Sequence, residues 1–161
     1  MKIIAISDTH IPNNASSLPK KLIEAIESAD LVVHTGDFVS LDLLKLLETK
    51  CKVKAVFGNM DSVEIRNRLS QCEIFNFAGK KIALVHGWGP PKNLLENIKE
   101  KFKDKKVDLV IFGHSHLPLT IKEDNTIYFN PGSPTDKIFA PYNSFGEINI
   151  DKDIKTKIIK L

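Results

Sequence analysis

Short apolar runs alternate with amphipathic segments over the first two thirds of the chain. The runs contain many β-branched residues and end abruptly at glycine or at a polar residue, which is typical of buried strands. They cover residues 2–7, 31–34, 52–57 and 107–112. Between them, leucine and isoleucine recur at helical spacing. Strands that alternate with helices in this way predict parallel β-α-β units with right-handed crossovers.

The rhythm changes after residue 70, where the connections become short turns. Pairs of strand-like segments are separated by turns at 78–80, 123–125 and 151–153, and each pair predicts a β-hairpin. The chain therefore combines a parallel N-terminal half with a later part that is more antiparallel. Two packed mixed sheets with helices on the outside accommodate both halves. A length of 161 residues, without a linker or a repeat, indicates a single domain over 1–161.

Local signals mark where the helices begin. Ser17 and Pro19 predict a helix start with proline in the first turn, and Ser40 predicts the cap of the next helix. The leucines of that second helix, between Leu41 and Leu47, predict burial on more than one of its sides.

Side chains that can bind a metal follow the predicted strands, at the point where each strand ends. They are Asp8, His10, Asp37, Asn59, His86, His114 and His116. Open α/β sheets place their ligands outside the carboxyl ends of the strands, so we expect these side chains to converge at one edge. In an extended His-x-His segment, the rings of His114 and His116 would lie on the same side of the backbone. His34 still belongs to its strand, and we interpret it as a hydrogen-bonded core histidine.

The chemistry of this set indicates more than one metal ion. Seven nitrogen and oxygen ligands without a thiolate exceed what one tetrahedral zinc needs, and they suit two divalent ions that share a carboxylate. Two such ions clamp the attacking and leaving oxygens of an in-line displacement at phosphorus, and they lower the pKa of a bridging water. No phosphate-binding glycine loop, nucleophile elbow or dinucleotide fingerprint competes with this interpretation.

Composition limits the cellular setting and the partners. The 23 basic and 20 acidic residues give a net charge of +3, and acidic residues interrupt the basic segment 99–106. The sequence therefore does not predict nucleic-acid binding. Cys51 and Cys72 lie in no metal or redox motif, which fits a reducing cytoplasm. Asp8 ends the N-terminal apolar run too early for a signal peptide, and no stretch is long enough to span a bilayer. We expect a soluble cytoplasmic protein, and a homo-oligomer stays open.

At these residues the sequence resembles the calcineurin-like metallophosphoesterase superfamily, in particular its small single-domain phosphodiesterases. The family's motifs occur in order as Asp8-x-His10, Gly36-Asp37, Gly58-Asn59-x-Asp61, His86-Gly87 and Gly113-His114-x-His116. The resemblance implies a four-layer αββα sandwich with a two-metal site. It implies that Asp8, His10 and His116 bind the first ion, that Asp37 bridges, and that Asn59, His86 and His114 bind the second. Residues 130–133, Asn-Pro-Gly-Ser, look like a family loop near the site.

The third motif departs from the commonest family pattern. Many members carry a histidine between the asparagine and the acid, where it assists the leaving group, and this chain has Met60. A thioether cannot donate a proton, so the general-acid contribution, typically about 10²–10⁴-fold, must come from elsewhere or be missing. Asn59 and Asp61 of this motif are the candidate catalytic residues. Asp61 followed by Glu64 also fits a capping box for the next helix.

The resemblance implies a two-metal phosphodiesterase in which a metal-bridging hydroxide attacks a small phosphodiester. Manganese is the expected metal, with iron, zinc, nickel and cobalt as alternatives. Two other functions stay open. The first is a non-catalytic protein-binding scaffold of the same fold, similar to a retromer subunit, which lacks the ligand that corresponds to His86. The second is a phosphomonoesterase or nucleotide phosphatase that uses the same metals, which the absence of the leaving-group histidine disfavours.

Overall fold

The computed structural model describes residues 1–161 and contains two five-stranded sheets. The first sheet has the strand order β10-β9-β1-β2-β3 and the second β4-β5-β6-β8-β7. The strands of the first sheet are β1 (Lys2–Ile6), β2 (Leu31–His34), β3 (Val53–Ala55), β9 (Ser144–Ile150) and β10 (Ile154–Lys160). Those of the second are β4 (Cys72–Phe77), β5 (Lys80–Val85), β6 (Leu109–Ile111), β7 (Leu119–Glu123) and β8 (Thr126–Asn130).

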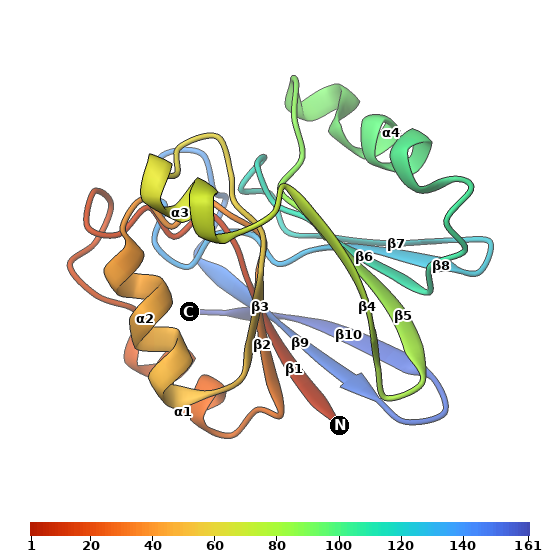
Figure 1. The fold of residues 1–161 in the computed structure, drawn as a ribbon, viewed down its shortest axis with the longest axis horizontal. Helices are drawn as coiled ribbons and strands as arrows, with labels where there is room; N and C mark the ends of the chain where they lie inside the picture. Colours follow the sequence, from red (N-terminus) through yellow and green to blue (C-terminus); the bar gives the residue numbers. More distant parts are fainter.

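Four helices cover the outer faces of the sheets (Figure 1). They are α1 (Lys20–Glu27), α2 (Leu41–Lys50), α3 (Val63–Arg68) and α4 (Pro91–Phe102). The first three pack against the first sheet, and α4 packs against the second. None of these helices is both long enough and apolar enough to cross a bilayer.

Alternation along the strands produces three apolar layers between these elements. Ile3 and Ala5 of β1 face the second sheet and join a cluster between the two sheets. Ile4 and Ile6 of the same strand face the helices and pack against side chains such as Leu22 of α1. A third cluster lies between the second sheet and α4. The expected αββα sandwich of two mixed sheets is confirmed.

Parallel pairing occupies the centre of both sheets. Strands β1, β2 and β3 pair in parallel, and so do β5, β6 and β8. The antiparallel partners are β4 and β7 at the edges of the second sheet and the hairpin β9–β10 in the first. The three predicted hairpins are therefore present, and the carboxyl ends of the parallel strands meet on one side of the sandwich.

Two local predictions about the helices differ from the structure, and one is confirmed. Helix α1 begins at Lys20 with Pro19 as its cap, so Ser17 neither caps the helix nor precedes a proline inside its first turn. Ser40 does cap α2 through the Asp42 N–H. The same helix is buried on one side only, because Leu46 is 42% exposed. The face of α2 that carries Leu46 points away from the sheet and toward solvent.

Candidate metal centre

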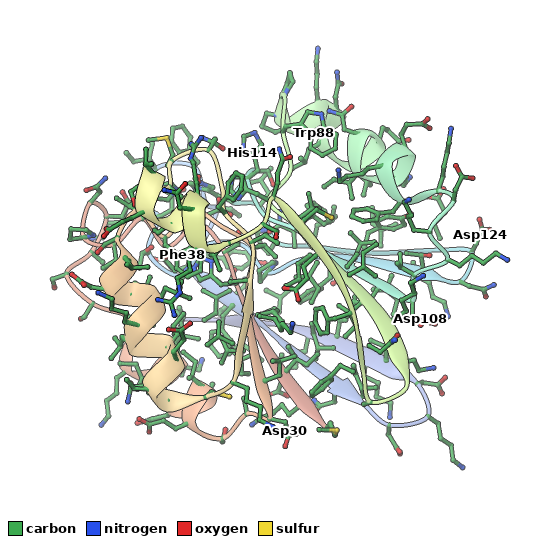
Figure 2. The ribbon with its side chains drawn as sticks, viewed as in Figure 1. Asp30, Phe38, Trp88, Asp108, His114 and Asp124 are labelled. Atoms are coloured by element: carbon green, nitrogen blue, oxygen red, sulfur yellow. The ribbon has the colours of Figure 1, made fainter.

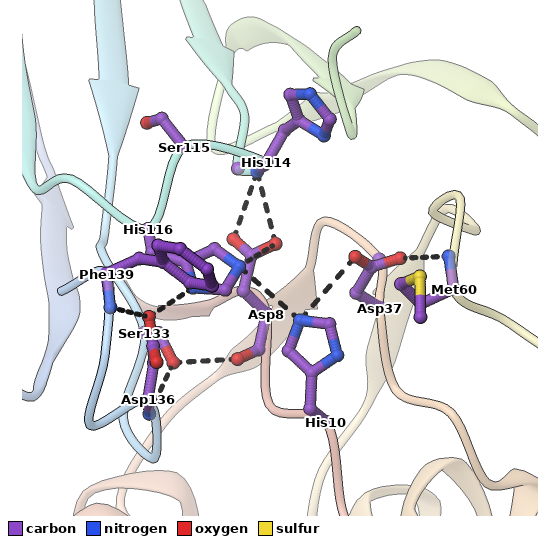
Figure 3. Close-up of polar contacts among 12 residues, drawn as sticks. Asp8, His10, Asp37, Met60, His114, Ser115, His116, Ser133, Asp136 and Phe139 are labelled. Atoms are coloured by element: carbon purple, nitrogen blue, oxygen red, sulfur yellow. Dashed lines mark hydrogen bonds and ion pairs between the residues drawn. The ribbon is translucent and has the colours of Figure 1, made fainter. Parts of the chain in front are cut away.

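The structure brings all seven candidate ligands to the edge where the parallel strands end. Figure 3 shows Asp8, His10, Asp37, His114 and His116 of this set. They come from the segments that follow β1, β2, β3, β5 and β6. Two groups of donor atoms form, with Asp37 between them. The set is Asp8, His10 and His116 on one side and Asn59, His86 and His114 on the other.

The first half of the centre contains Asp8, His10 and His116. The Nε2 atoms of the two histidines lie 3.4 Å apart, and His116 Nε2 lies 3.5 Å from Asp8 Oδ1. Asp8 is fully buried, and its carboxylate accepts a hydrogen bond from the backbone N–H of His114 at 3.0 Å. The donor atoms of these three side chains are therefore close enough to share one cation.

The second half contains Asn59, His86 and His114. His86 Nε2 lies 3.0 Å from Asn59 Oδ1, and His114 Nδ1 lies 3.1 Å from the same oxygen. The two histidine nitrogens are 3.3 Å apart. One amide oxygen and two imidazole nitrogens thus converge on a second point.

Asp37 lies between the two halves. Its Oδ2 atom is 3.6 Å from His10 Nε2 and 3.4 Å from His86 Nε2, so one oxygen faces both groups. Its Oδ1 accepts a hydrogen bond from the Met60 N–H at 2.7 Å. Burial alone would raise the pKa of Asp37, but the hydrogen bond and charge of His86 outweigh burial, and the pKa is lowered. Asp37 is therefore held as a carboxylate.

Hydrogen bonds on the far side of the rings fix which nitrogen faces the centre. The Nδ1–H of His86 donates to the Thr35 carbonyl at 2.8 Å, so its Nε2 carries the lone pair when the ring is neutral. The Nδ1–H of His116 donates to Asp136 in the same way. Both lone pairs then face carboxylate oxygens, an arrangement of acceptor against acceptor. Either a proton or a cation must lie between them, and the donor set fits a divalent metal.

His86 shows the electrostatic consequence of this arrangement in the metal-free protein. Burial disfavours the imidazolium, but the carboxylates of Asp37 and Asp8 outweigh burial and raise the pKa of His86 to about 9. The ring is thus protonated at neutral pH when no cation is bound. A metal ion would replace this proton in neutralising the two carboxylates.

Five of the seven candidate ligands have a left-handed backbone. The φ angles are 54° at Asp8, 43° at His10, 59° at Asp37, 69° at His114 and 59° at His116. Residues with a Cβ rarely adopt this region, which costs free energy and persists at sites that the surrounding structure fixes. The expectation of an extended His-x-His segment is therefore wrong. The left-handed turn sends the His114 ring to the second half and the His116 ring to the first.

Glycines allow the loops to approach one another closely. A Cβ on Gly58 would lie 2.2 Å from Asp37 Oδ1, and a Cβ on Gly113 would lie 1.8 Å from Ser7 Oγ. The first clash would displace the Asp37 carboxylate, and the second would push the His114 N–H away from Asp8. The glycine that precedes Asn59 and the one that precedes His114 are thus required by packing.

Asp61 does not cap helix α3, which corrects the capping-box prediction. Ser62 is the cap and accepts from the Ile65 N–H. The Asp61 carboxylate instead accepts three backbone N–H bonds, from Gly58, Asp37 and Val39, at 2.7, 2.9 and 2.8 Å. Burial raises the pKa of Asp61, against the effect of these bonds. Asp61 therefore positions the loops that carry Asp37 and Asn59, and it holds them from behind the donor atoms.

Sequence reasoning missed Asp136, whose carboxylate holds the His116 ring. Burial opposes its charge, but the hydrogen bond from His116 outweighs burial and lowers the pKa of Asp136. The expected loop at 130–133 does lie at the site, because Ser133 Oγ donates to the Asp8 carbonyl at 2.7 Å. The Asp136 N–H in turn donates to Ser133 Oγ. A Ser-x-x-Asp pattern after Pro-Gly was the one signal that could have revealed Asp136.

His34 lies behind the centre as a core residue. Its ring is fully buried and stacks on Phe38 with centroids 3.6 Å apart. Nε2 contacts Thr9 Oγ1 at 3.1 Å, and Nδ1 accepts from the Gly36 N–H. Both ring nitrogens are therefore occupied, and the interpretation of His34 as a hydrogen-bonded core histidine is confirmed.

A cleft of about 480 Å³ opens over the centre. Its floor includes His10, Asp37 and His114, and its walls carry Met60, Leu117 and Phe139. Phe139 is 68% exposed and lies edge-on to the His116 ring. A polar floor under apolar walls suits a charged reacting group that carries an apolar substituent.

A comparison with protein families agrees with this geometry. The profile of the calcineurin-like phosphoesterase superfamily domain matches residues 1–153. The chain belongs to this superfamily. Relatives in this superfamily include a probable metallophosphoesterase from Methanothermobacter thermautotrophicus, which is 37% identical over 139 residues. That match covers 84% of this chain and 78% of the relative.

Solved structures that are similar to this chain have different functional descriptions. A structure described as a novel archaeal phosphodiesterase is 26% identical, covers 100% of both chains and has a TM-score of 0.79. Vps29 from Entamoeba histolytica, solved in complex with zinc, is 23% identical, covers 99% of both chains and has a TM-score of 0.75. The second likeness shows a shared fold alone. The calcineurin-like phosphoesterase fold thus accommodates proteins described in different functional terms.

Proposed function

We propose that this protein is a metal-dependent phosphodiesterase with two divalent ions, manganese by preference, at the seven candidate ligands. The observation that carries the proposal is the position of Asp37 Oδ2, which lies 3.6 Å from a histidine nitrogen of one half and 3.4 Å from a histidine nitrogen of the other. A buried carboxylate in that position is suited to bridge two cations. Membership of the calcineurin-like phosphoesterase superfamily supports the same chemistry.

The residues of the two halves would hold the cations in place. Asp8, His10 and His116 would bind one ion, and Asn59, His86 and His114 would bind the other. When bound, two such ions lower the pKa of water and neutralise the charge that develops on the phosphoryl oxygens. Asp136 and the Thr35 carbonyl orient the histidines from behind, which keeps the ligand nitrogens aimed inward.

The cleft favours a diester over a monoester. Met60 stands where many superfamily members carry a histidine, and it is 55% exposed toward the cleft. It cannot protonate a leaving oxygen, so substrates with good leaving groups are preferred. The apolar walls formed by Met60, Leu117 and Phe139 offer contact area to one ester substituent and leave the second substituent of a diester free to extend elsewhere.

The scaffold alternative is supported by the structural likeness to Vps29. The observation against it is the complete ligand set, with His86 buried and its Nε2 aimed at Asp37. A surface-binding module would gain nothing from five strained backbone conformations that orient ligand side chains.

Metal reconstitution tests the proposal. The protein is stripped with a chelator and supplied separately with Mn²⁺, Zn²⁺, Ni²⁺ or Co²⁺. Hydrolysis of bis(p-nitrophenyl) phosphate is then compared with that of p-nitrophenyl phosphate at equal concentration. We expect metal-dependent hydrolysis, fastest with Mn²⁺, and a higher kcat/KM for the diester.

Two variants separate the site from a contaminant. Asp37→Asn removes the bridging charge and should lower kcat/KM by at least about a hundredfold. Asp104→Asn makes the same chemical change at an exposed aspartate that no ion pair holds, and it should match the parent. If Asp37→Asn hydrolyses the diester as fast as the parent with every ion, the activity does not come from this site. That result would support the scaffold alternative.

A further inference from the structure

A second pocket of about 210 Å³ adjoins the second half of the centre. Asn59 and His86 line it on the side of the centre, and its other lining residues include Trp88, Arg66 and Lys101. Its volume is below the range of about 300–1,000 Å³ that is usual for whole ligands, so it suits one group of a larger molecule. Figure 2 shows Trp88 on the segment before α4, on the same side of the molecule as His114.

Arg66 enters this pocket with free hydrogen-bond donors. Its Nε–H donates to the Asp61 carbonyl at 2.9 Å, and its Nη2 donates to the Asn59 carbonyl at 2.6 Å. Both acceptors are neutral backbone oxygens. Three of the five guanidinium N–H groups keep no partner in the protein, and the full positive charge stays next to the pocket.

Lys101 supplies a second charge from the last turn of α4. Its Nζ lies 5.5 Å from the centre of the Trp88 ring. Neither Lys101 nor Arg66 has a carboxylate within 4.0 Å, whereas nearby Arg68 pairs with Glu48 and Lys99 pairs with Glu123. No acidic side chain lines the pocket. It is therefore a cationic pocket without an internal counter-charge.

The pocket and the apolar cleft both reach Asn59 and share no other lining residue. Met60, Leu117 and Phe139 line the cleft only, whereas Trp88, Arg66 and Lys101 line the pocket only. A phosphodiester held at the centre can thus direct its leaving group along the apolar wall and its other substituent toward the cations. The Trp88 segment is fixed for this role, because Asn97 donates to the Trp88 carbonyl and His114 donates to the Gly89 carbonyl.

We propose that this pocket binds a phosphate group on the substituent that remains attached to the reacting phosphorus. The inference rests on the proposed phosphodiesterase function and names its substrate class, a phosphodiester with a second, terminal phosphate. Arg66 and Lys101 bind the phosphate oxygens, and Trp88 forms the wall against which the linking group packs. These are specificity residues and take no part in the chemical step.

Two esters that differ by one group test this preference. Thymidine 5′-(p-nitrophenyl phosphate) and its 3′-phosphorylated form release the same leaving group, and only the second carries the terminal phosphate. We expect a KM about three- to tenfold lower for the phosphorylated ester, because a charge-assisted hydrogen bond at an exposed site is weakened by solvent. The advantage should shrink as NaCl rises from 50 to 500 mM.

Charge-removing variants assign the preference to the pocket. Lys101→Gln is the cleaner variant, because Lys101 makes no contact with a candidate ligand, and Arg66→Gln is the second. Both should reduce the ratio of the two KM values toward one. The matched controls are Lys105→Gln, shortly after the end of α4, and Arg68→Gln, at the end of α3. Both variants should keep the ratio of KM values of the parent.

A second readout does not depend on catalysis. Trp88 is the only tryptophan in the chain, so its fluorescence, excited at 295 nm, reports directly on this pocket. Inorganic pyrophosphate, titrated into the metal-free protein, should cause a saturable change in emission. The change should vanish in Lys101→Gln and persist in Lys105→Gln.

The outcomes separate this inference from the proposed function. If neither ester is hydrolysed with any metal, the proposed function fails, and the fluorescence titration alone decides whether the pocket binds phosphate. If both esters are hydrolysed with equal KM, or if the advantage is unchanged in Lys101→Gln and Arg66→Gln, the phosphate pocket is refuted and the phosphodiesterase stands. A saturable titration together with a lowered KM supports both.

Discussion

The two halves of the candidate metal centre are held by different kinds of partner. In the first half, His116 donates to a carboxylate, that of Asp136. In the second half, His86 and His114 donate to the neutral carbonyls of Thr35 and Gly89. A carboxylate behind a histidine makes the ligating nitrogen more basic than a carbonyl does. Two ligand sets of similar composition can therefore bind cations with different affinities.

The first half also has more negative charge around it than the second half. The first half contains the carboxylate of Asp8, whereas the second offers the neutral amide of Asn59. The uncompensated cations Arg66 and Lys101 also lie beside the second half. We therefore expect the first half to bind its cation more tightly, with the second ion the more easily lost on dilution.

Lowering the pH should weaken cation binding most strongly in the second half. A cation must displace the proton of His86, whose pKa is about 9 in the metal-free protein, so apparent affinity falls about tenfold for each pH unit below 9. Between pH 9 and 7 the loss is about a hundredfold. Isothermal titration with Mn²⁺ at several pH values measures it, and a weaker equivalent whose affinity does not change with pH would contradict the assignment of His86.

In the metal-free protein, the raised pKa of His86 makes lower pH stabilise the fold, although lower pH weakens metal binding. Protonated His86 stabilises the fold fully below the unfolded-state pKa of about 6.5, and this contribution is lost as pH rises through 9. The Tm of the metal-free protein should therefore fall over that interval, whereas saturating metal should remove the fall or reverse it.

Replacing Asp136 by Asn should make the halves more alike. The amide keeps the shape of the side chain but removes the charge behind His116, and the first ion should bind about 10- to 100-fold more weakly. In a titration with Mn²⁺, the affinity of the tighter equivalent should fall toward that of the weaker one. Asp104→Asn is the control. Equal weakening of both equivalents would indicate instead that the loop at 133–140 had lost its structure.

The smallest effect is expected at Met60, on the second half. Met60→His places an imidazole where many superfamily members have one, and the exposed position leaves room for the ring. General-acid help is worth about 10²–10⁴-fold when it is well placed, and we expect about tenfold in kcat for p-nitrophenyl phosphate from an unoptimised group. Met60→Leu should give no gain. A gain confined to the diester would argue against a leaving-group role.

Much of the fold followed from the sequence because its signals are local. Buried runs such as 107–112, turns such as 78–80 and the cap at Ser40 each predict their own structure. The pairing of β9 with β1 could not be predicted, because it joins segments at opposite ends of the chain through registers that only packing selects. The same holds for the central parallel strands of the second sheet.

The convergence of the candidate ligands was predictable, and the partners that hold them in place were not. Asp8 and Asp37 follow buried strands, and that position alone brought them to one edge. Asp61 fits a helix-cap pattern in the sequence, yet its carboxylate accepts from the Gly58 N–H of its own loop and from two N–H groups of the loop after β2. Asp136 reaches His116 only because the loop after β8 folds back over the site. Such partners depend on tertiary contacts that a linear pattern does not encode.

The left-handed conformations at five ligand positions make this centre a property of its loops as much as of its side chains. Grafting the seven residues onto another scaffold with extended or helical connections would leave the rings aimed apart, even with every amino acid type retained. An engineer who wished to move this centre, or a survey that sought unrelated proteins with a similar one, should start from the sequence of turn conformations and choose the donor groups afterwards.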